Sequence, residues 1–100
     1  MLHALTGDSH TTGPSAPGHP TSGWWGGLIG PGLAIDTNKY FVVTPNVLGG
    51  CQGSTGPASL NPKGQEYGPN FPQLTIKDQA LSFEVLAQQL DVSRWFSIIG

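Results

Sequence analysis

The sequence predicts an α/β protein in which a small parallel sheet is combined with one crossover helix and long loops. Two apolar runs without polar alternation, at residues 40–44 and 94–99, are typical of strands buried on both faces, as in parallel sheets. A stretch with helical periodicity lies between them, and strands that alternate with helical segments favour parallel pairing. A short apolar run at residues 1–5 supplies the first of three predicted strands.

The segments between the first two strands are rich in turn-forming residues. Residues 11–22 are almost entirely Thr, Ser, Gly and Pro, so we expect a flexible insert in which nothing packs. The apolar stretch at residues 24–35 is interrupted by Gly30, Pro31 and Gly32, which exclude a regular helix. A short helical turn followed by an irregular loop is therefore expected there.

The second half of the chain contains one long loop and the predicted helix. Residues 46–73 are punctuated by glycine and proline, and loops of this length in compact domains are functional or disordered. We expect this loop on the active-site side. A helix over residues 76–90 follows from one apolar face, and Thr75 with Asp78 has the spacing of a helix N-cap. That face consists of Ile76, Ala80, Phe83, Ala87 and Leu90.

Composition excludes several classes of protein. The 100 residues include only 4 Lys and Arg and carry a net charge of -2, which excludes a basic nucleic-acid binder and an electrostatic membrane binder. No apolar run is long enough for a transmembrane helix, and no secretory signal is visible. A single cysteine cannot form an internal disulfide, which favours a reducing compartment and a cytoplasmic location. We expect one domain over residues 1–100, rich enough in loops to be part of a larger protein.

Two glycine-associated motifs have alternative interpretations. Ser54 lies in a Gly-Ser-Thr-Gly run, but no strand leads directly into it as a nucleophile elbow requires, so a loop hydroxyl that bonds backbone is favoured. Gly50, Gly53 and Gly56 suggest a phosphate cradle, but no lysine or helix start follows them. Tight turning of the backbone is the favoured explanation.

Several other side chains are of types that can act as metal ligands, nucleophiles or stacking surfaces. His3, His10 and His19 have irregular spacings, and no set of four ligands is completed, so no metal site is predicted. Cys51 has no basic neighbour to activate it, which favours a small buried apolar residue over a nucleophile. The pair formed by Trp24 and Trp25 could stack on a base or a sugar, but packing in the core is favoured.

Several runs of the sequence together resemble the homoserine O-acetyltransferase family. They are residues 3–10 (HALTGDSH), 23–25 (GWW), 28–32 (LIGPG), 34–37 (AIDT), 40–43 (YFVV), 46–57 (NVLGGCQGSTGP) and 61–62 (NP). The resemblance continues through Phe71, Pro72, Thr75, Ile76, Asp78 and the last apolar run. It covers essentially the whole chain apart from residues 11–22, and the run at residues 49–57 is highly specific.

The resemblance implies an α/β-hydrolase fold, of which the chain would form a part with three parallel strands in the spatial order 4-3-5. It also implies transfer of an acetyl group from acetyl-CoA to the hydroxyl of homoserine, in methionine biosynthesis, through an acyl-serine and a Ser-His-Asp triad. In the family the nucleophile follows a glycine like Gly100 within a few residues. We therefore expect an N-terminal fragment that ends just before the nucleophile elbow and is inactive alone. His3, His10 and Asp8 do not take the roles of the triad.

The same resemblance assigns site residues. Leu5 is expected to offer its backbone N–H to the oxyanion, and Ala4, Leu5, Thr6 and Gly7 to shape substrate choice beside the reacting carbonyl. The small residues and the glycine already favour such a donor, because they leave a backbone N–H free to point at developing charge. Asn46 is expected to border the entrance of the site. No metal and no bound cofactor are expected.

Partners and alternatives follow from the resemblance as well. Homoserine and acetyl-CoA, which is a co-substrate, are the expected partners of the full-length enzyme, and the family commonly forms homodimers. A related acyltransferase that uses succinyl-CoA or accepts serine stays open with the same fold and mechanism. A remnant without function is the second alternative.

Overall fold

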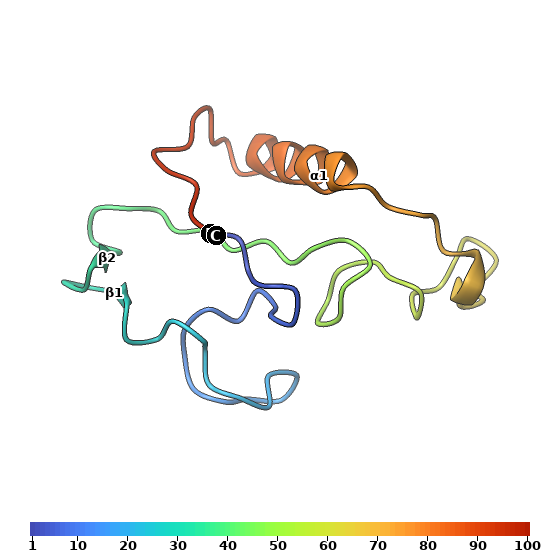
Figure 1. Cartoon of the computed structure of the whole chain (residues 1–100), viewed down its shortest axis with the longest axis horizontal. Coiled ribbons are helices and arrows are strands. Elements are labelled where there is room, and N and C mark those ends of the chain that lie inside the picture. Colours follow the sequence, from blue (N-terminus) through green and yellow to red (C-terminus); the bar gives the residue numbers. More distant parts are fainter. The chain divides into compact units, whose positions relative to one another are not determined.

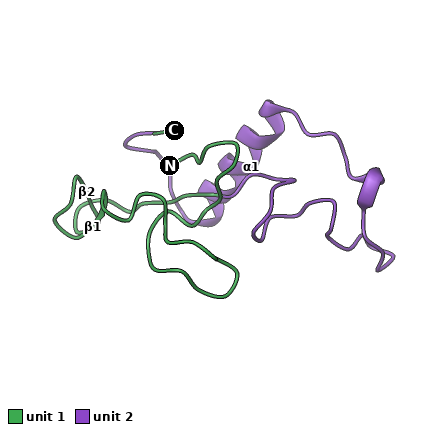
Figure 2. Cartoon of the chain, turned by 60° about the horizontal axis from the view of Figure 1, so that its bottom comes forward, with its two compact units in different colours: residues 1–45, 99–100 green, residues 46–98 purple.

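The computed structural model describes residues 1–100 and contains four short regular elements. They are the strands β1 (Ile29–Gly30) and β2 (Ile35–Asp36), the 3-10 helix η1 (Gly68–Asn70) and the helix α1 (Ile76–Gln89), as Figure 1 shows. The chain divides into two compact units, coloured in Figure 2. Unit 1 comprises Met1–Pro45 with Ile99–Gly100, and unit 2 comprises Asn46–Ile98. That the whole chain forms one domain stays a prediction.

The regular structure of unit 1 is a two-residue parallel pair. Ile29 pairs with Ile35 and Gly30 with Asp36, so the turn at residues 31–34 brings the chain back alongside β1 in the same direction. The Asp36 carboxylate holds this turn by accepting N–H bonds from Gly32 at 2.8 Å and Asn38 at 3.0 Å. These two bonds hold the pKa of Asp36 below its ordinary value, and the bond from Gly32 is the larger cause.

None of the three predicted strands forms as a strand. The segments 1–5, 40–44 and 94–99 lie outside every regular element. Within unit 1 the first segment meets the others through single hydrogen bonds. The Met1 amino group donates to the Val43 carbonyl at 2.8 Å, and the Leu2 N–H donates to the Ile99 carbonyl at 2.7 Å. One bond on each side is not a ladder, which needs successive pairs of residues, so the predicted strands and their order 4-3-5 are not confirmed.

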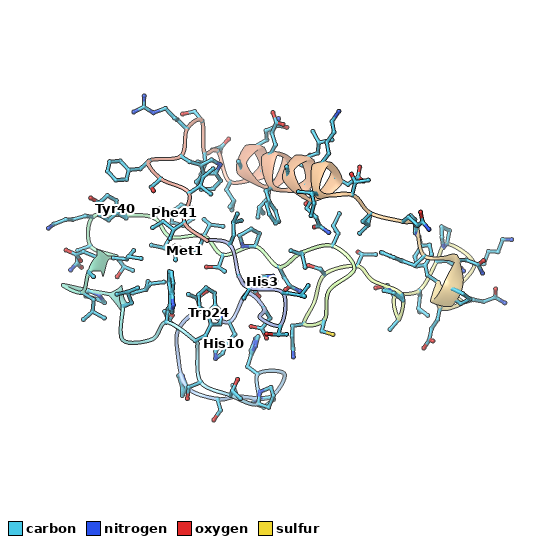
Figure 3. All side chains as sticks on the ribbon, in the orientation of Figure 1. Met1, His3, His10, Trp24, Tyr40 and Phe41 are labelled. Atoms are coloured by element: carbon cyan, nitrogen blue, oxygen red, sulfur yellow. The ribbon has the colours of Figure 1, made fainter.

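The predicted burial of these runs on both faces is wrong. Phe41, labelled in Figure 3, is 70% exposed, and Phe96 is 82% exposed. The reason is that a parallel sheet is buried only where helices cover both of its faces, and this chain has a single α-helix. The buried apolar residues are Ile29 in unit 1 and Ala87 in unit 2.

Most of the segment 11–22 is exposed, as its composition suggests, but Thr11 and His19 make contacts that were not expected. Thr11 is only 7% exposed, and Ala16 and His19 exchange two backbone hydrogen bonds of 2.8 Å across a turn that contains Gly18 at φ 86°. The His19 ring stacks on that of His10. Composition does not reveal these contacts, because they depend on a local turn and on the flanking residue His10. Its flexibility stays a prediction.

The helix predicted in unit 2 is present as α1, and its N-terminus is a complete capping box. The Thr75 hydroxyl accepts the Asp78 N–H at 3.2 Å, while the Asp78 carboxylate accepts the Thr75 N–H at 2.7 Å. The Thr75 hydroxyl also donates to that carboxylate at 2.7 Å. These bonds hold the pKa of Asp78 below its ordinary value, the side-chain bond from Thr75 being the main cause. At 14 residues α1 is too short to cross a membrane, and no other helix could do so.

The predicted apolar face of α1 is covered only in part. Ala87 is buried, but Ile76 is 86% exposed. The clearest anchor of the helix is polar instead. The Gln79 side-chain amide accepts the Leu48 N–H at 2.9 Å and donates to the Leu48 carbonyl at 2.8 Å. This pair of bonds fixes α1 to the first part of the loop at residues 46–73, which contains Gly49, Gly50, Gly53 and Gly56 and is called the glycine-rich loop below.

Candidate functional site

A tight turn at residues 4–7 carries the expected oxyanion donor. The Gly7 N–H donates to the Ala4 carbonyl at 2.8 Å, which closes a four-residue turn with Leu5 and Thr6 at its centre. Neither central residue has a positive φ, so the turn is of the type I class. Such a turn uses only the first carbonyl and the last N–H. The N–H groups of Leu5 and Thr6 accordingly have no acceptor in the protein.

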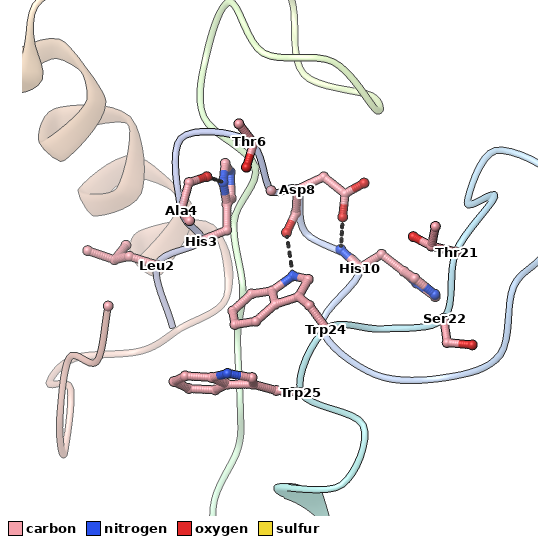
Figure 4. A pocket seen from close by; sticks show the side chains of 12 residues that line it. Leu2, His3, Ala4, Thr6, Asp8, His10, Thr21, Ser22, Trp24 and Trp25 are labelled. Atoms are coloured by element: carbon pink, nitrogen blue, oxygen red, sulfur yellow. Dashed lines mark hydrogen bonds between the residues drawn. The ribbon is translucent and has the colours of Figure 1, made fainter.

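The His3 ring contacts the same carbonyl oxygen. Its Nδ1 lies 2.8 Å from the Ala4 oxygen, as the dashed line in Figure 4 marks. A carbonyl oxygen only accepts, so the imidazole carries its proton on Nδ1 in this contact. The Ala4 oxygen therefore receives two donors, the Gly7 N–H and the His3 ring.

A cavity of about 480 Å³ lies beside this turn, entirely within unit 1. Its wall includes three of the predicted site residues, Ala4, Thr6 and Gly7. Leu5 is not among the lining residues, and its side chain is fully exposed. The full lining, most of which Figure 4 labels, is Leu2, His3, Ala4, Thr6, Gly7, Asp8, His10, Thr21, Ser22, Trp24, Trp25 and Gly100.

Another part of the cavity wall is formed by two tryptophans and the segment after the turn. The Trp24 indole donates to the Asp8 carbonyl at 3.1 Å, and the Asp8 carboxylate accepts the His10 backbone N–H at 2.7 Å. The rings of Trp24 and Trp25 lie 5.0 Å apart at 58°. Trp24 is 37% exposed, so the expectation that these rings pack in a core is wrong, and they border the cavity instead.

His10 and His19 form a stacked pair, with ring centroids 4.2 Å apart and planes inclined by 16°. The His10 Nε2 and the His19 Nδ1 are buried and have no hydrogen-bond partner. Each nitrogen lone pair lies in the plane of its own ring. Two stacked rings therefore direct their lone pairs along separate planes, and they cannot share one cation unless a ring turns. No group of three or more His, Cys, Asp or Glu residues is gathered in the structure.

The remaining predicted site residue, Asn46, lies in unit 2 and organises the glycine-rich loop. Its side-chain amide donates to the Cys51 carbonyl, and its own carbonyl accepts the Ser54 hydroxyl at 3.0 Å. The prediction that Ser54 bonds backbone is therefore confirmed. Cys51 is exposed, so its predicted burial is wrong. The loop turns at Gly53, which follows Gln52 and has a φ of 107°.

The histidines and the aspartate of unit 1 do not form a catalytic triad. The Asp8 carboxylate accepts the His10 backbone N–H and not its imidazole, and the ring of His10 faces His19. What unit 1 brings together is a pair of backbone donors beside a cavity. Unpaired backbone N–H groups are able to donate to an oxyanion, but unit 1 does not gather the groups that would attack a carbonyl.

No family model matches the chain, but curated proteins and solved structures do. The chain is 59% identical over all of its 100 residues to the homoserine O-acetyltransferase of Clavibacter michiganensis subsp. michiganensis (strain NCPPB 382), and 56% identical to that of Thermobifida fusca (strain YX). In each case it covers 26% of the relative. The chain thus spans about a quarter of the length of the curated relatives it matches.

Two solved structures extend this likeness to the fold. The crystal structure of esterase E22 matches 99% of the chain at a TM-score of 0.85 and 35% identity, and the chain covers 29% of it. The homoserine O-acetyltransferase from Bacillus anthracis matches 93% of the chain at a TM-score of 0.78 and 40% identity, with 27% of that protein covered.

Proposed function

Because the chain belongs to the homoserine O-acetyltransferase family and its fold is α/β-hydrolase-like, we propose that it supplies the oxyanion-binding side of an acyltransferase site. The observation that supports this proposal is the turn at residues 4–7. The Leu5 N–H has no acceptor in the protein, and the residues on either side of Leu5 line a cavity. A donor held without a partner beside a cavity is what an oxyanion requires.

The reaction we propose for the longer protein is transfer of acetyl from acetyl-CoA to the hydroxyl of homoserine. A serine oxygen attacks the thioester carbonyl and gives its proton to a histidine, and the carbonyl oxygen becomes an oxyanion. The Leu5 N–H donates to that oxyanion. The C–S bond then breaks, the CoA sulfur takes the proton from the histidine, and an acetyl-serine remains. The homoserine hydroxyl attacks this ester, which releases O-acetylhomoserine and restores the serine.

Within that reaction this chain contributes the donor and part of the substrate pocket. We assign substrate selection to Ala4, Thr6 and Gly7, which line the cavity beside the turn. From the family resemblance we also propose that Asn46, which organises its own loop, borders the entrance of the site in the longer protein. Acetyl-CoA is consumed as a substrate, and no resident cofactor takes part. We further propose that the longer protein is a cytoplasmic homodimer that functions in methionine biosynthesis.

A second candidate function is ester hydrolysis, and the similarity to esterase E22 favours it. Water would then replace homoserine as the group that attacks the acyl-serine, while the oxyanion donor would act unchanged. If the longer protein used succinyl-CoA in place of acetyl-CoA, the transferred acyl group would differ, but the role of Leu5 would stay the same. These candidates are separated by the product, which is acetate for hydrolysis and an O-acyl amino acid for transfer.

An exchange of segments tests the proposal. The 100 residues of this chain replace the matching segment of the Clavibacter michiganensis relative, which is 59% identical over that length. The hybrid enzyme is expected to form O-acetylhomoserine from acetyl-CoA and homoserine. The chain alone is expected to form none, because it holds no triad. A hybrid that is folded and inactive would contradict the proposal, as would turnover by the isolated chain, and acetate as the main product would favour hydrolysis.

A further inference from the structure

The peptide group between Ala4 and Leu5 has its two ends in different environments. Its carbonyl oxygen accepts hydrogen bonds from the Gly7 N–H and from the His3 ring, while its N–H has no acceptor. We propose that His3 is a positioning residue that fixes the direction of the Leu5 N–H. This inference rests on the proposed function, since it explains how that donor is kept in place.

The argument depends on the planarity of the peptide bond. In a trans peptide the C=O and the N–H lie in one plane and point in opposite directions. Any group that holds the Ala4 oxygen therefore also sets where the Leu5 N–H points, although it never touches that N–H. His3 acts on the donor from the far side of the same peptide group.

Two donors restrain this peptide better than one. The hydrogen bond from the Gly7 N–H lies on an exposed part of the chain, where water competes for the Ala4 oxygen. By itself it would therefore restrain the peptide only weakly. The His3 Nδ1 approaches the same oxygen at 2.8 Å, so the carbonyl receives a donor for each of its two lone pairs. Rotation of the peptide plane would then break both bonds at once.

Gly7 keeps the three groups close together. A Cβ at position 7 would lie 3.3 Å from the Ala4 oxygen and 3.3 Å from the His3 Cβ. Both distances are tighter than ordinary van der Waals contact. The absence of a side chain at Gly7 therefore leaves the room in which the His3 ring reaches the carbonyl.

The contact also specifies which substitutions can replace His3. Its donor, Nδ1, is separated from Cβ by one atom. The amide nitrogen of an asparagine has the same separation, while that of a glutamine is one atom further away. His3→Asn should therefore restore the bond to the Ala4 oxygen, His3→Gln should restore it poorly, and His3→Ala should abolish it.

The first test uses the chain as it is, by nuclear magnetic resonance. The His3 ring should carry its proton on Nδ1, and the Gly7 amide should exchange with solvent more slowly than those of Leu5 and Thr6. His3→Ala should accelerate exchange at Gly7, His3→Asn should reverse that change, and His19→Ala serves as a control that leaves Gly7 unchanged. Equal Gly7 exchange in the parent and in His3→Ala would overturn the inference.

The second test separates this inference from the proposed function. In the hybrid enzyme, His3→Ala is expected to lower kcat about tenfold to hundredfold, less than loss of a whole oxyanion donor, with little change in the KM for homoserine. His3→Asn should recover most of kcat. An inactive parent hybrid would refute the proposed function itself. An active parent with an unchanged kcat in His3→Ala would refute only the role of His3.

Discussion

The Leu2 N–H donates a 2.7 Å hydrogen bond to the Ile99 carbonyl and so brings the two ends of the chain together, as Figure 1 shows. Gly100 consequently lies against Leu2, where a Cβ on the glycine would come within 2.9 Å of the Leu2 Cβ. Both residues line the same cavity as the turn at residues 4–7. Gly100 therefore borders the same cavity of unit 1 as Ala4, Thr6 and Gly7.

Gly23→Ala should disrupt the wall of that cavity. A Cβ at Gly23 would lie 2.6 Å from the Thr11 carbonyl carbon and closer still to the Thr12 backbone. Backbone cannot yield as a flexible side chain does, so we expect a loss of about 1–3 kcal/mol in the free energy of unfolding of unit 1. Chemical denaturation followed by tryptophan fluorescence measures this change.

Gly27→Ala is the matched control for that substitution, because nothing lies within 4 Å of its Cβ position. It should leave the denaturation midpoint near that of the parent. Equal midpoints for the two variants would contradict the close approach of segments 11–13 and 23–25.

Gln79→Ala should detach α1 from the glycine-rich loop of unit 2. The side chain makes two hydrogen bonds to the Leu48 backbone, each worth about 0.5–1.5 kcal/mol net, so the free energy of unfolding of unit 2 should fall by about 1–3 kcal/mol. Gln88→Ala on the exposed part of the same helix is the control. If both variants unfold at the same urea concentration, the bonds to Leu48 contribute nothing to stability.

The capping box makes the stability of α1 depend on pH. The pKa of Asp78 in the folded chain lies below its ordinary value of 3.8, so its ionised form stabilises the helix above pH 3.8. That stabilisation should be lost as the pH falls through the lowered pKa. Far-UV circular dichroism during an acid titration measures it. Asp78→Asn should remove this transition, and an identical acid transition in parent and variant would contradict the assignment.

The helix could be predicted from sequence because its signals are local. Apolar residues at helical spacing and the Thr75–Asp78 pair specify α1 without reference to the rest of the chain. The strands could not be predicted reliably. An apolar run such as residues 40–44 becomes a strand only when neighbours complete its ladder and helices cover its faces, and neither condition is visible in the run itself.

The site was predictable to the extent that it depends on the turn. The small residues and glycine at 3–7, together with the family resemblance, pointed to Leu5 as a donor. The sequence excludes His3 as a metal ligand and as a member of the triad, but it does not show the contact with Ala4, because that contact depends on a side chain that turns back onto the next carbonyl in the chain. Its position immediately before the turn was the one signal that could have identified it. The stacking of His10 on His19 could not be predicted from the spacing of the histidines in the sequence.

Removal of the Leu5 N–H tests the central claim most directly. Proline is favoured at the second position of a type I turn and lacks an N–H, so Leu5→Pro in the hybrid enzyme deletes the donor while it keeps the turn. Leu5→Ala retains the donor, and the ratio of the two kcat values isolates the contribution of the N–H. We expect kcat for acyl transfer to be about 10²–10³-fold lower in Leu5→Pro than in Leu5→Ala. Equal kcat values in two folded variants would contradict the account.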